Sequence, residues 1–289
     1  MHETATATTS ESVPSSSKPA VAASSLVHRW WASRVGRPFL FEIGLIGTLL
    51  FCYKYVRFLA RDAGSVAIDN AERVLEVERA FGVAIESQIQ SVVLESRGLV
   101  ELINQYYVAS HFAVTIGVMV WLYFFRYSVY RRMRWVMFGI TMLALLVHVV
   151  FPLAPPRMLD DIGFIDTLKH YGPSIYGPTD EGSANQFAAM PSLHFGYAAM
   201  AAWGIIAALK TRWRYLAALH PFAMLVAIVA TANHFLLDAI AAGAMLALTG
   251  ALVWFVVKPL PEDDPDFIEE PDDGTDRELA DDPGLELAG

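Results

Sequence analysis

The sequence predicts an all-α, polytopic membrane protein with six transmembrane helices and an interfacial amphipathic helix. Of the 289 residues, 55% are hydrophobic and only 18% are charged, whereas a soluble domain carries about 25% charged residues. The apolar residues are gathered in long runs instead of being spread along the chain. No stretch alternates polar and apolar residues as a half-buried β-strand would. These three observations together exclude a large soluble core.

The charge of the chain is divided unevenly. The formal net charge is −9, but residues 261–289 hold 13 acidic residues and one basic residue, which leaves 17 acidic and 20 basic residues elsewhere. The remainder has no basic patch for nucleic acid, and the single cysteine excludes a disulfide framework. We therefore predict a membrane domain at 28–258, between a disordered tail at 1–27 and an acidic disordered tail at 259–289.

The predicted transmembrane segments follow from the length of the apolar runs. A helix that crosses a bilayer needs about 20 consecutive apolar residues. The runs that meet this requirement lie at about 39–60, 105–125, 135–152, 190–209, 215–232 and 235–257.

Basic segments predict the orientation of these six spans. Arginine and lysine gather before the first span, in the loop at 126–134 and in the loop at 210–214. With six spans all three segments lie on one side, and basic loops favour the cytoplasm. The N- and C-termini are then cytoplasmic, and the topology fits a bacterial plasma membrane.

The stretch from Val66 to Ile103 has helical periodicity but too many charges to cross a bilayer. One interpretation is an amphipathic helix at the outer membrane surface. The other is a helix that packs against the rest of the protein.

Titratable residues in membrane segments are costly and therefore indicate function. His194 lies 16 residues before Lys210, about 24 Å of helix, and His234 lies 20 residues after Arg214, about 30 Å. Both histidines are thus expected near the outer face, with Asp238 one helical turn after His234. Arg157 directly follows the third span on the same side.

The residue types at this level suit phosphate chemistry. A carboxylate four residues after His234 lies on the same helical face and can fix the tautomer of the imidazole. Pro191 can open a helix whose first N–H groups, together with the Ser192 hydroxyl, face an anion. A guanidinium held between prolines and the membrane, such as that of Arg157, binds phosphate through two hydrogen bonds.

At these residues the sequence resembles the type 2 phosphatidic acid phosphatase superfamily, in particular the branch of the aureobasidin-resistance protein, the catalytic part of inositol phosphorylceramide synthase. The superfamily motifs are K-x6-R-P, P-S-G-H and S-R-x5-H-x3-D, and the resemblance covers about residues 100–257. The residues that match are Arg157 in the first motif, Pro191, Ser192 and His194 in the second, and His234 and Asp238 in the third. The positions that depart from the motifs are Val150, Met158, Leu193, Ala227 and Ile228.

The resemblance implies cleavage of a lipid-linked phosphate at the outer leaflet without a metal or other cofactor. His234 would attack phosphorus and become a phosphohistidine, Asp238 would orient it, and His194 would serve as acid and then as base. Arg157 and Ser192 would hold the phosphate oxygens. Water as acceptor gives a phosphatase, and an alcohol such as inositol gives a phosphotransferase; the P-S-L-H form favours the latter, while related bacterial chains favour the former.

Three further residues are candidates for lining the substrate pocket, namely His111, Tyr107 and Lys169. The partners expected from this interpretation are a lipid phosphate, a polar alcohol and the membrane lipids themselves.

Two alternatives start from the same residues. A small non-enzymatic transporter could use His and Asp as a proton relay, but its polar residues belong at the bilayer midplane, and Ser192 and Arg157 would have no role. A relative of the vanadate-dependent haloperoxidases would share the ligand pattern, but those proteins are soluble.

Overall fold

The computed structural model describes residues 37–60, 63–159, 163–172 and 186–258. The chain forms two units, Met1–Gly44 and Leu45–Gly289, of which the first contributes only residues 37–44 to the described part. The two tails predicted at 1–27 and 259–289 lie outside the described residues.

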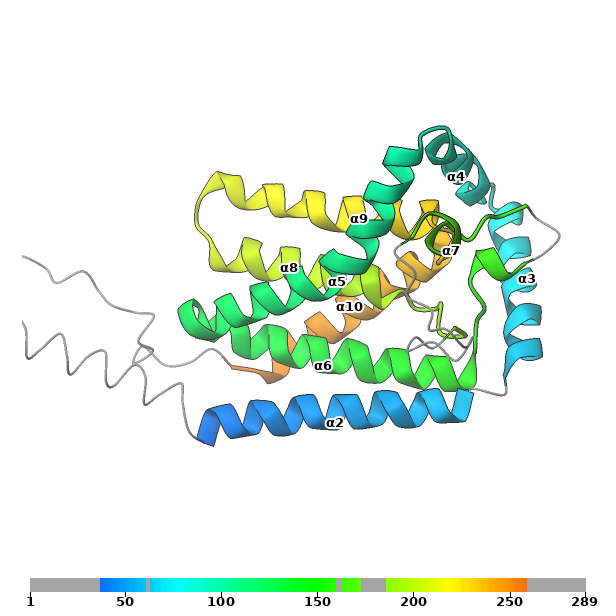
Figure 1. Cartoon of the computed structure of the whole chain (residues 1–289). Helices are drawn as coiled ribbons and strands as arrows, with labels where there is room; N and C mark the ends of the chain where they lie inside the picture. Colours follow the sequence, from blue (N-terminus) through cyan, green and yellow to red (C-terminus); the bar gives the residue numbers. More distant parts are fainter. Residues whose placement is uncertain (1–36, 61–62, 160–162, 173–185, 259–289) are drawn as a thin grey trace, which may run out of the picture. The chain divides into compact units, whose positions relative to one another are not determined.

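Helices account for all the regular structure in the described ranges, apart from one isolated bridge between Leu153 and Ala188, so the predicted all-α fold class is confirmed (Figure 1). The elements are α2 (Arg37–Ala60), α3 (Gly64–Ala80), α4 (Glu86–Leu94), α5 (Arg97–Phe125), α6 (Tyr127–Val150), η1 (Pro156–Met158), α7 (Thr167–Tyr171), α8 (Leu193–Ala208), η3 (Arg212–Ala218), α9 (Leu219–Ala230) and α10 (Leu236–Val256).

In the part of the chain that the structure describes, five segments are long and apolar enough to cross a membrane, and they indicate an integral membrane protein. They lie within α2, α5, α6, η3 with α9, and α10. The fourth predicted span corresponds to α8, which is apolar but has only 16 residues. It begins late because Ser192, after Pro191, is its N-cap and accepts a hydrogen bond from the Phe195 N–H. At about 1.5 Å per residue α8 is about 24 Å long, so the count of six spans stays a prediction.

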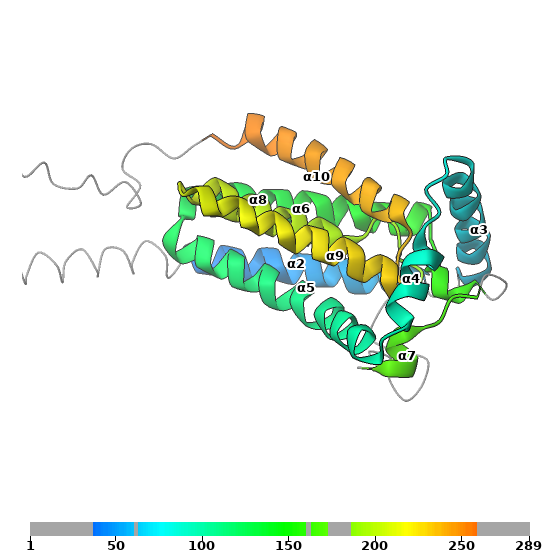
Figure 2. The ribbon, with the colours of Figure 1, turned by 90° about the horizontal axis from the view of Figure 1, so that it is seen from above.

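The helix α8 is the centre of the bundle. It contacts α5, α6, α9 and α10, and the two views show these helices running side by side (Figures 1 and 2). Small residues on α8, among them Gly196 and Gly204, allow its neighbours to approach closely. The tightest approach involves Gly250 on α10, where an added Cβ would lie 2.6 Å from the Trp203 ring of α8.

The basic segment at 126–134, predicted as a loop, is helical except at its first residue. The α5 helix ends at Phe125 and α6 begins at Tyr127, with Arg126 between them. The physical reason is that the segment has no glycine or proline and that arginine is a good helix former. Arg134 is buried in α6 with its guanidinium carbon 5.1 Å from the centre of the Trp135 ring.

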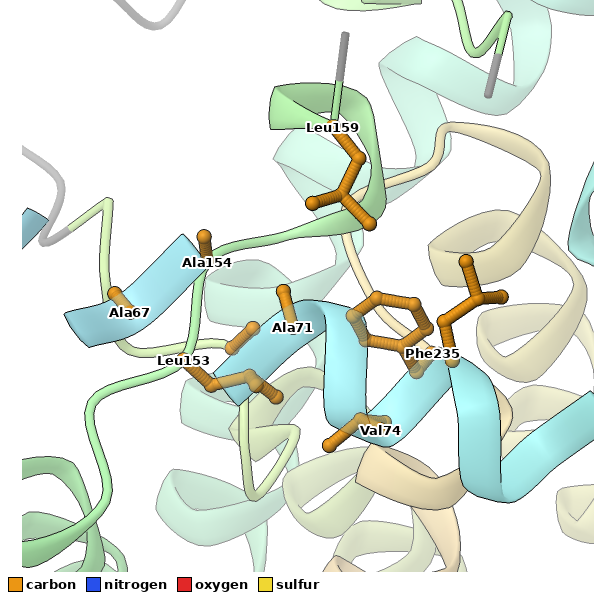
Figure 3. Packing of buried hydrophobic residues seen from close by; sticks show 9 residues of the cluster. Ala67, Ala71, Val74, Leu153, Ala154, Leu159 and Phe235 are labelled. Atoms are coloured by element: carbon orange, nitrogen blue, oxygen red, sulfur yellow. The ribbon is translucent and has the colours of Figure 1, made fainter. Parts of the chain in front are cut away.

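The amphipathic stretch at 66–103 is divided among α3, α4 and the start of α5, and α3 and α4 lie at one end of the bundle (Figures 1 and 2). One face of α3 packs as the second interpretation predicted. Its buried residues Ala67, Ala71 and Val74 form a cluster with the 153–159 segment and Phe235, whose ring lies beside them (Figure 3). Burying the large Phe235 ring here fixes the residue next to His234.

Three buried amide side chains fasten the segment that follows α6. Asn70 of α3 donates to the Pro152 carbonyl at 2.9 Å. Gln90 of α4 donates to the Ile165 carbonyl at 3.0 Å and accepts from the Ile165 N–H at 2.9 Å. Asn104 of α5 donates to the Thr167 carbonyl at 2.8 Å. Since a buried polar group is costly without a partner, these bonds hold the loop in one arrangement.

The end of α9 turns the chain toward α10. The Ala232 N–H donates to the Val229 carbonyl and the Asn233 N–H to the Ile228 carbonyl, the two bonds of a Schellman motif. Ala232 takes the left-handed position of this motif with φ +50°, where glycine is the usual residue. The turn explains why α9 ends at Ala230, two residues before the predicted limit.

Candidate active site

His234 is held in one tautomer by two acceptors. Its Nδ1 lies 2.8 Å from the Ala189 carbonyl oxygen and 3.3 Å from Oδ2 of Asp238. A carbonyl oxygen can only accept, so Nδ1 carries the hydrogen and donates. The lone pair is therefore on Nε2. This is the orientation of the imidazole that the spacing of His234 and Asp238 predicts.

Asp238 connects this imidazole to α10, the helix that follows it in the chain. Its Oδ2 also accepts from the Phe235 N–H at 2.9 Å, and its backbone carbonyl accepts from the Ser192 N–H at 3.0 Å. The side chain is fully buried. Asp238 therefore fixes His234 relative to the first turn of α10 and ties this turn to the start of α8.

His194 faces His234 from the start of α8. The centroids of the two imidazole rings are 5.7 Å apart. On its other side, His194 stacks on Tyr107 with centroids 4.3 Å apart and an interplanar angle of 15°, and its centroid lies 4.0 Å from that of His111. Two of the pocket-lining candidates, both on α5, thus contact the predicted acid and base directly.

Arg157 lies beside the same turn. It belongs to η1, and its backbone N–H donates to the Ala232 carbonyl at 3.0 Å. Its Nη1 donates to Oδ1 of Asn233 at 2.7 Å, and its Nε lies 3.2 Å from Oδ2 of Asp166. The side chain is only 7% exposed. Because Asn233 adjoins His234 in the chain, the structure places Arg157 against the turn that carries His234.

Ser192, a predicted phosphate-binding residue, has a structural role. It is fully buried, and its hydroxyl accepts from the Phe195 N–H while its own backbone N–H donates to Asp238. The hydroxyl still has a hydrogen to donate. The Ser192 backbone N–H, which was expected to face an anion, is thus engaged by α10.

Lys169, the third pocket-lining candidate, is exposed on α7, and its backbone N–H donates to Oδ1 of Asp166. The same carboxylate bridges Lys169 and Arg157. His148 is a further buried histidine near the site, and its imidazole lies close to the Pro191 backbone. It supports the segment that leads into α8. Within the described ranges, no group of three His, Cys, Asp or Glu side chains is arranged to hold a metal ion.

Two glutamates at the site were missed by sequence reasoning. Glu86 of α4 accepts from the Leu236 N–H at 2.9 Å, and Glu78 of α3 accepts from the Leu237 N–H at 2.8 Å. Both are buried, with 1% and 0% of their surface exposed. They satisfy two of the N–H groups that have no partner within the first turn of α10.

A signal for Glu78 is present in the sequence. It follows Ala67, Ala71, Val74 and Leu75 at the spacing of one helical face, all of which are buried. Burial raises the pKa of the Glu78 carboxyl to about 8; the hydrogen bond from Leu237 opposes this rise, and the nearby Glu86 carboxyl adds to it.

The arrangement suits a tetrahedral anion. A neutral imidazole offers Nε2 as nucleophile, a second imidazole 5.7 Å away can donate or accept a proton, and a fixed guanidinium can bind charged oxygens. These groups come from α8, the 156–158 turn and the start of α10, which are far apart in the sequence.

Comparison with known proteins gives one result. Residues 72–253 match the family described as the PAP2 superfamily, and this range contains Arg157, His194, His234 and Asp238. No curated protein and no solved structure matches the chain.

Proposed function

Because the chain belongs to the PAP2 superfamily, in which phosphatase-type action on lipid phosphates is the common activity, we propose that it removes the phosphate of a membrane lipid through a phosphohistidine intermediate. The observation that carries the proposal is the hydrogen bond from Nδ1 of His234 to the Ala189 carbonyl, which leaves a lone pair on Nε2. A transporter that only relays protons does not require a fixed tautomer opposite a buried guanidinium.

In the first step Nε2 of His234 attacks phosphorus, a P–N bond forms, and the bond from phosphorus to the lipid oxygen breaks. His194 in its protonated form gives its proton to that oxygen, and the lipid alcohol leaves. In the second step His194 takes a proton from water as the water oxygen attacks phosphorus. The P–N bond breaks, and inorganic phosphate and free His234 are released. Arg157 stabilises the charge on the non-bridging oxygens throughout.

A second acceptor is supported by Leu193, which stands in the P-S-L-H form of the motif. In that variant of the reaction an alcohol such as inositol replaces water in the second step. The first step and the roles of His234, His194 and Arg157 are the same in both reactions. The product therefore depends on whether water or an alcohol reaches the phosphohistidine.

The experiment uses the purified full chain in detergent with EDTA. Phosphate release is measured from phosphatidate, sphingolipid-type phosphates, and polyprenyl phosphates and diphosphates, with and without inositol. Wild type is compared with His234→Ala and His194→Ala. General acid–base assistance contributes about 10²–10⁴-fold to such reactions, so His194→Ala should lose turnover by that factor. His234→Ala should lose it completely.

A ³²P-labelled phospholipid distinguishes a phosphohistidine intermediate from direct hydrolysis by water. The readout is whether label becomes attached to the protein and whether that label is stable to acid and to base. Acid-labile, base-stable label on wild type and His194→Ala, absent from His234→Ala, is the expected result. Release that is unchanged in His234→Ala, or no turnover of any lipid in the panel, contradicts the proposal and favours the transporter. A product containing inositol identifies the transferase.

A further inference from the structure

Three carboxyl groups meet at the N-terminus of α10. Asp238 lies in its first turn, Glu78 arrives from α3, and Glu86 arrives from α4. The two glutamates accept from consecutive backbone N–H groups, and the Glu86 carboxyl lies near enough to Glu78 to raise its pKa. Among the described residues, neither glutamate forms an ion pair with lysine or arginine. The titratable base next to this cluster is His234, which pairs with Asp238.

The charge of this cluster is too high for all three groups to be ionised. A helix N-terminus supplies the equivalent of about half a positive charge, and carboxylates that share a site cannot both ionise readily. A hydrogen bond between two carboxyl groups also requires a proton on one of them. Glu78 Oε2 is buried and has no hydrogen-bond partner in the described part of the chain, so this oxygen can carry the proton and donate it to the neighbouring Glu86 carboxyl. The geometry therefore points to one proton held between Glu78 and Glu86.

We propose that Glu78 and Glu86 are positioning residues that share this proton and, in that form, clamp the first turn of α10 beneath His234 and Asp238. Deprotonation of the pair places a further negative charge next to Asp238, loosens the turn and lowers turnover. The inference rests on the proposed function for its catalytic consequence, whereas the clamp itself is a property of the fold.

The pH dependence has a definite sign. The pKa of Glu78 lies at about 8, above its ordinary value of 4.5. A group whose pKa is raised by folding stabilises the fold when it is protonated, and this stabilisation is lost as the pH rises toward the raised value. The hold of Glu78 and Glu86 on the first turn of α10 should therefore weaken as the pH rises through about 8. Below that pH the contact between Asp238 and His234 should persist.

The test compares wild type with Glu78→Gln, Glu78→Ala and the control Glu76→Gln, which changes an exposed carboxylate on the same helix. Glutamine keeps an acceptor for the Leu237 N–H and a donor for Glu86, so it mimics the protonated acid at every pH. Each protein is examined between pH 6 and pH 10. The readouts are kcat and KM for a lipid phosphate and the hydrogen-exchange protection factors of residues 235–239.

In wild type and Glu76→Gln, kcat and protection should fall together above about pH 8. In Glu78→Gln both should persist to higher pH. In Glu78→Ala protection should be low at all pH values, and kcat should fall about tenfold or more with KM within about twofold, because small displacements of catalytic groups cost rate more than binding.

The inference is overturned if Glu78→Gln follows the wild-type pH profile in both readouts, or if Glu78→Ala keeps the wild-type protection. Glu78→Gln preserves size and hydrogen bonding, so it decides the matter even where Glu78→Ala fails to fold. Absence of turnover in wild type overturns the proposed function alone, and the protection factors then decide the clamp.

Discussion

At the scale of single residues, Arg157 is held in place by its surroundings before any ligand binds. Asn233 accepts from Nη1 and Asp166 lies against Nε, so the planar guanidinium has one orientation relative to His234. A guanidinium fixed in this way binds phosphate oxygens without a further loss of side-chain entropy.

Asn233→Ala should therefore lower kcat/KM for a lipid phosphate by about 10- to 100-fold, since a hydrogen bond to a charged group contributes about 1.5–3 kcal/mol. Asn233→Asp keeps an acceptor for Nη1 and should stay near wild type. Arg97→Ala is the matched control, because it removes an exposed guanidinium that pairs only with the nearby Glu101 in the described structure. Equal activity of Asn233→Ala and wild type would show that Arg157 needs no such support.

The residues with a chemical signature were predictable from the sequence. His234, His194, Asp238 and Arg157 were expected at one level from helix lengths alone, and the structure brings them together. Asn233, Ala189 and Glu86 were not predictable, because they act through a backbone carbonyl or a contact between distant segments, for which a single sequence has no local pattern.

At the scale of elements, the close contact of α8 and α10 determines how the helix that carries His194 lies against the helix that follows His234. Gly250 leaves room for the Trp203 ring, and an added Cβ would approach two of its atoms at 2.6 and 2.7 Å. An indole ring is rigid, so it cannot move its far end aside as a leucine can.

Gly250→Ala should lower the thermal unfolding midpoint in detergent, because overpacking a tight contact costs about 1–3 kcal/mol. Gly117→Ala on α5 is the control, since an added Cβ there meets nothing within 4 Å. This control should match or exceed the wild-type midpoint, as alanine favours helix. A Gly250→Ala protein as stable as the control would mean that Trp203 relocates at little cost.

Helix boundaries were harder to predict than helices. The apolar runs located α5, α6 and α10, but the run at 190–209 included Pro191 and Ser192, which precede the helix. The Schellman turn after α9 was missed because it uses Ala232 in place of the glycine that marks such turns. In each case local backbone geometry, and not hydropathy, sets the end.

At the scale of the whole molecule, the contacts of Arg157 bear on how often the chain crosses the membrane. Arg157 follows α6 and Asn233 follows α9, yet their side chains are 2.7 Å apart. The two helices therefore finish at the same end of the bundle. Between them the chain leaves this end along α8 and returns to it along η3 and α9, so α8 has to run from one end of the bundle to the other. We accordingly expect α8 to cross the membrane although it has only 16 residues.

Six crossings place both termini on one side, and five place them on opposite sides. In a Cys52→Ser background, single cysteines replacing Ser25, His170 and Thr275 should react differently with a membrane-impermeant maleimide in intact cells. We expect labelling at position 170 only, and labelling of 25 and 275 after the membrane is opened. Labelling of 275 but not 25 in intact cells would indicate five crossings.

The contacts of Glu86 and Glu78 with α10 also determine when the site can assemble during synthesis of the chain. These hydrogen bonds join residues 150 and 159 positions apart in the chain. At about 5–20 residues per second of synthesis, roughly 8–30 s pass between the synthesis of the two glutamates and the synthesis of their partners. Since His234 and Asp238 adjoin Leu236 and Leu237 in the chain, a nascent chain has no assembled site until α10 has been made.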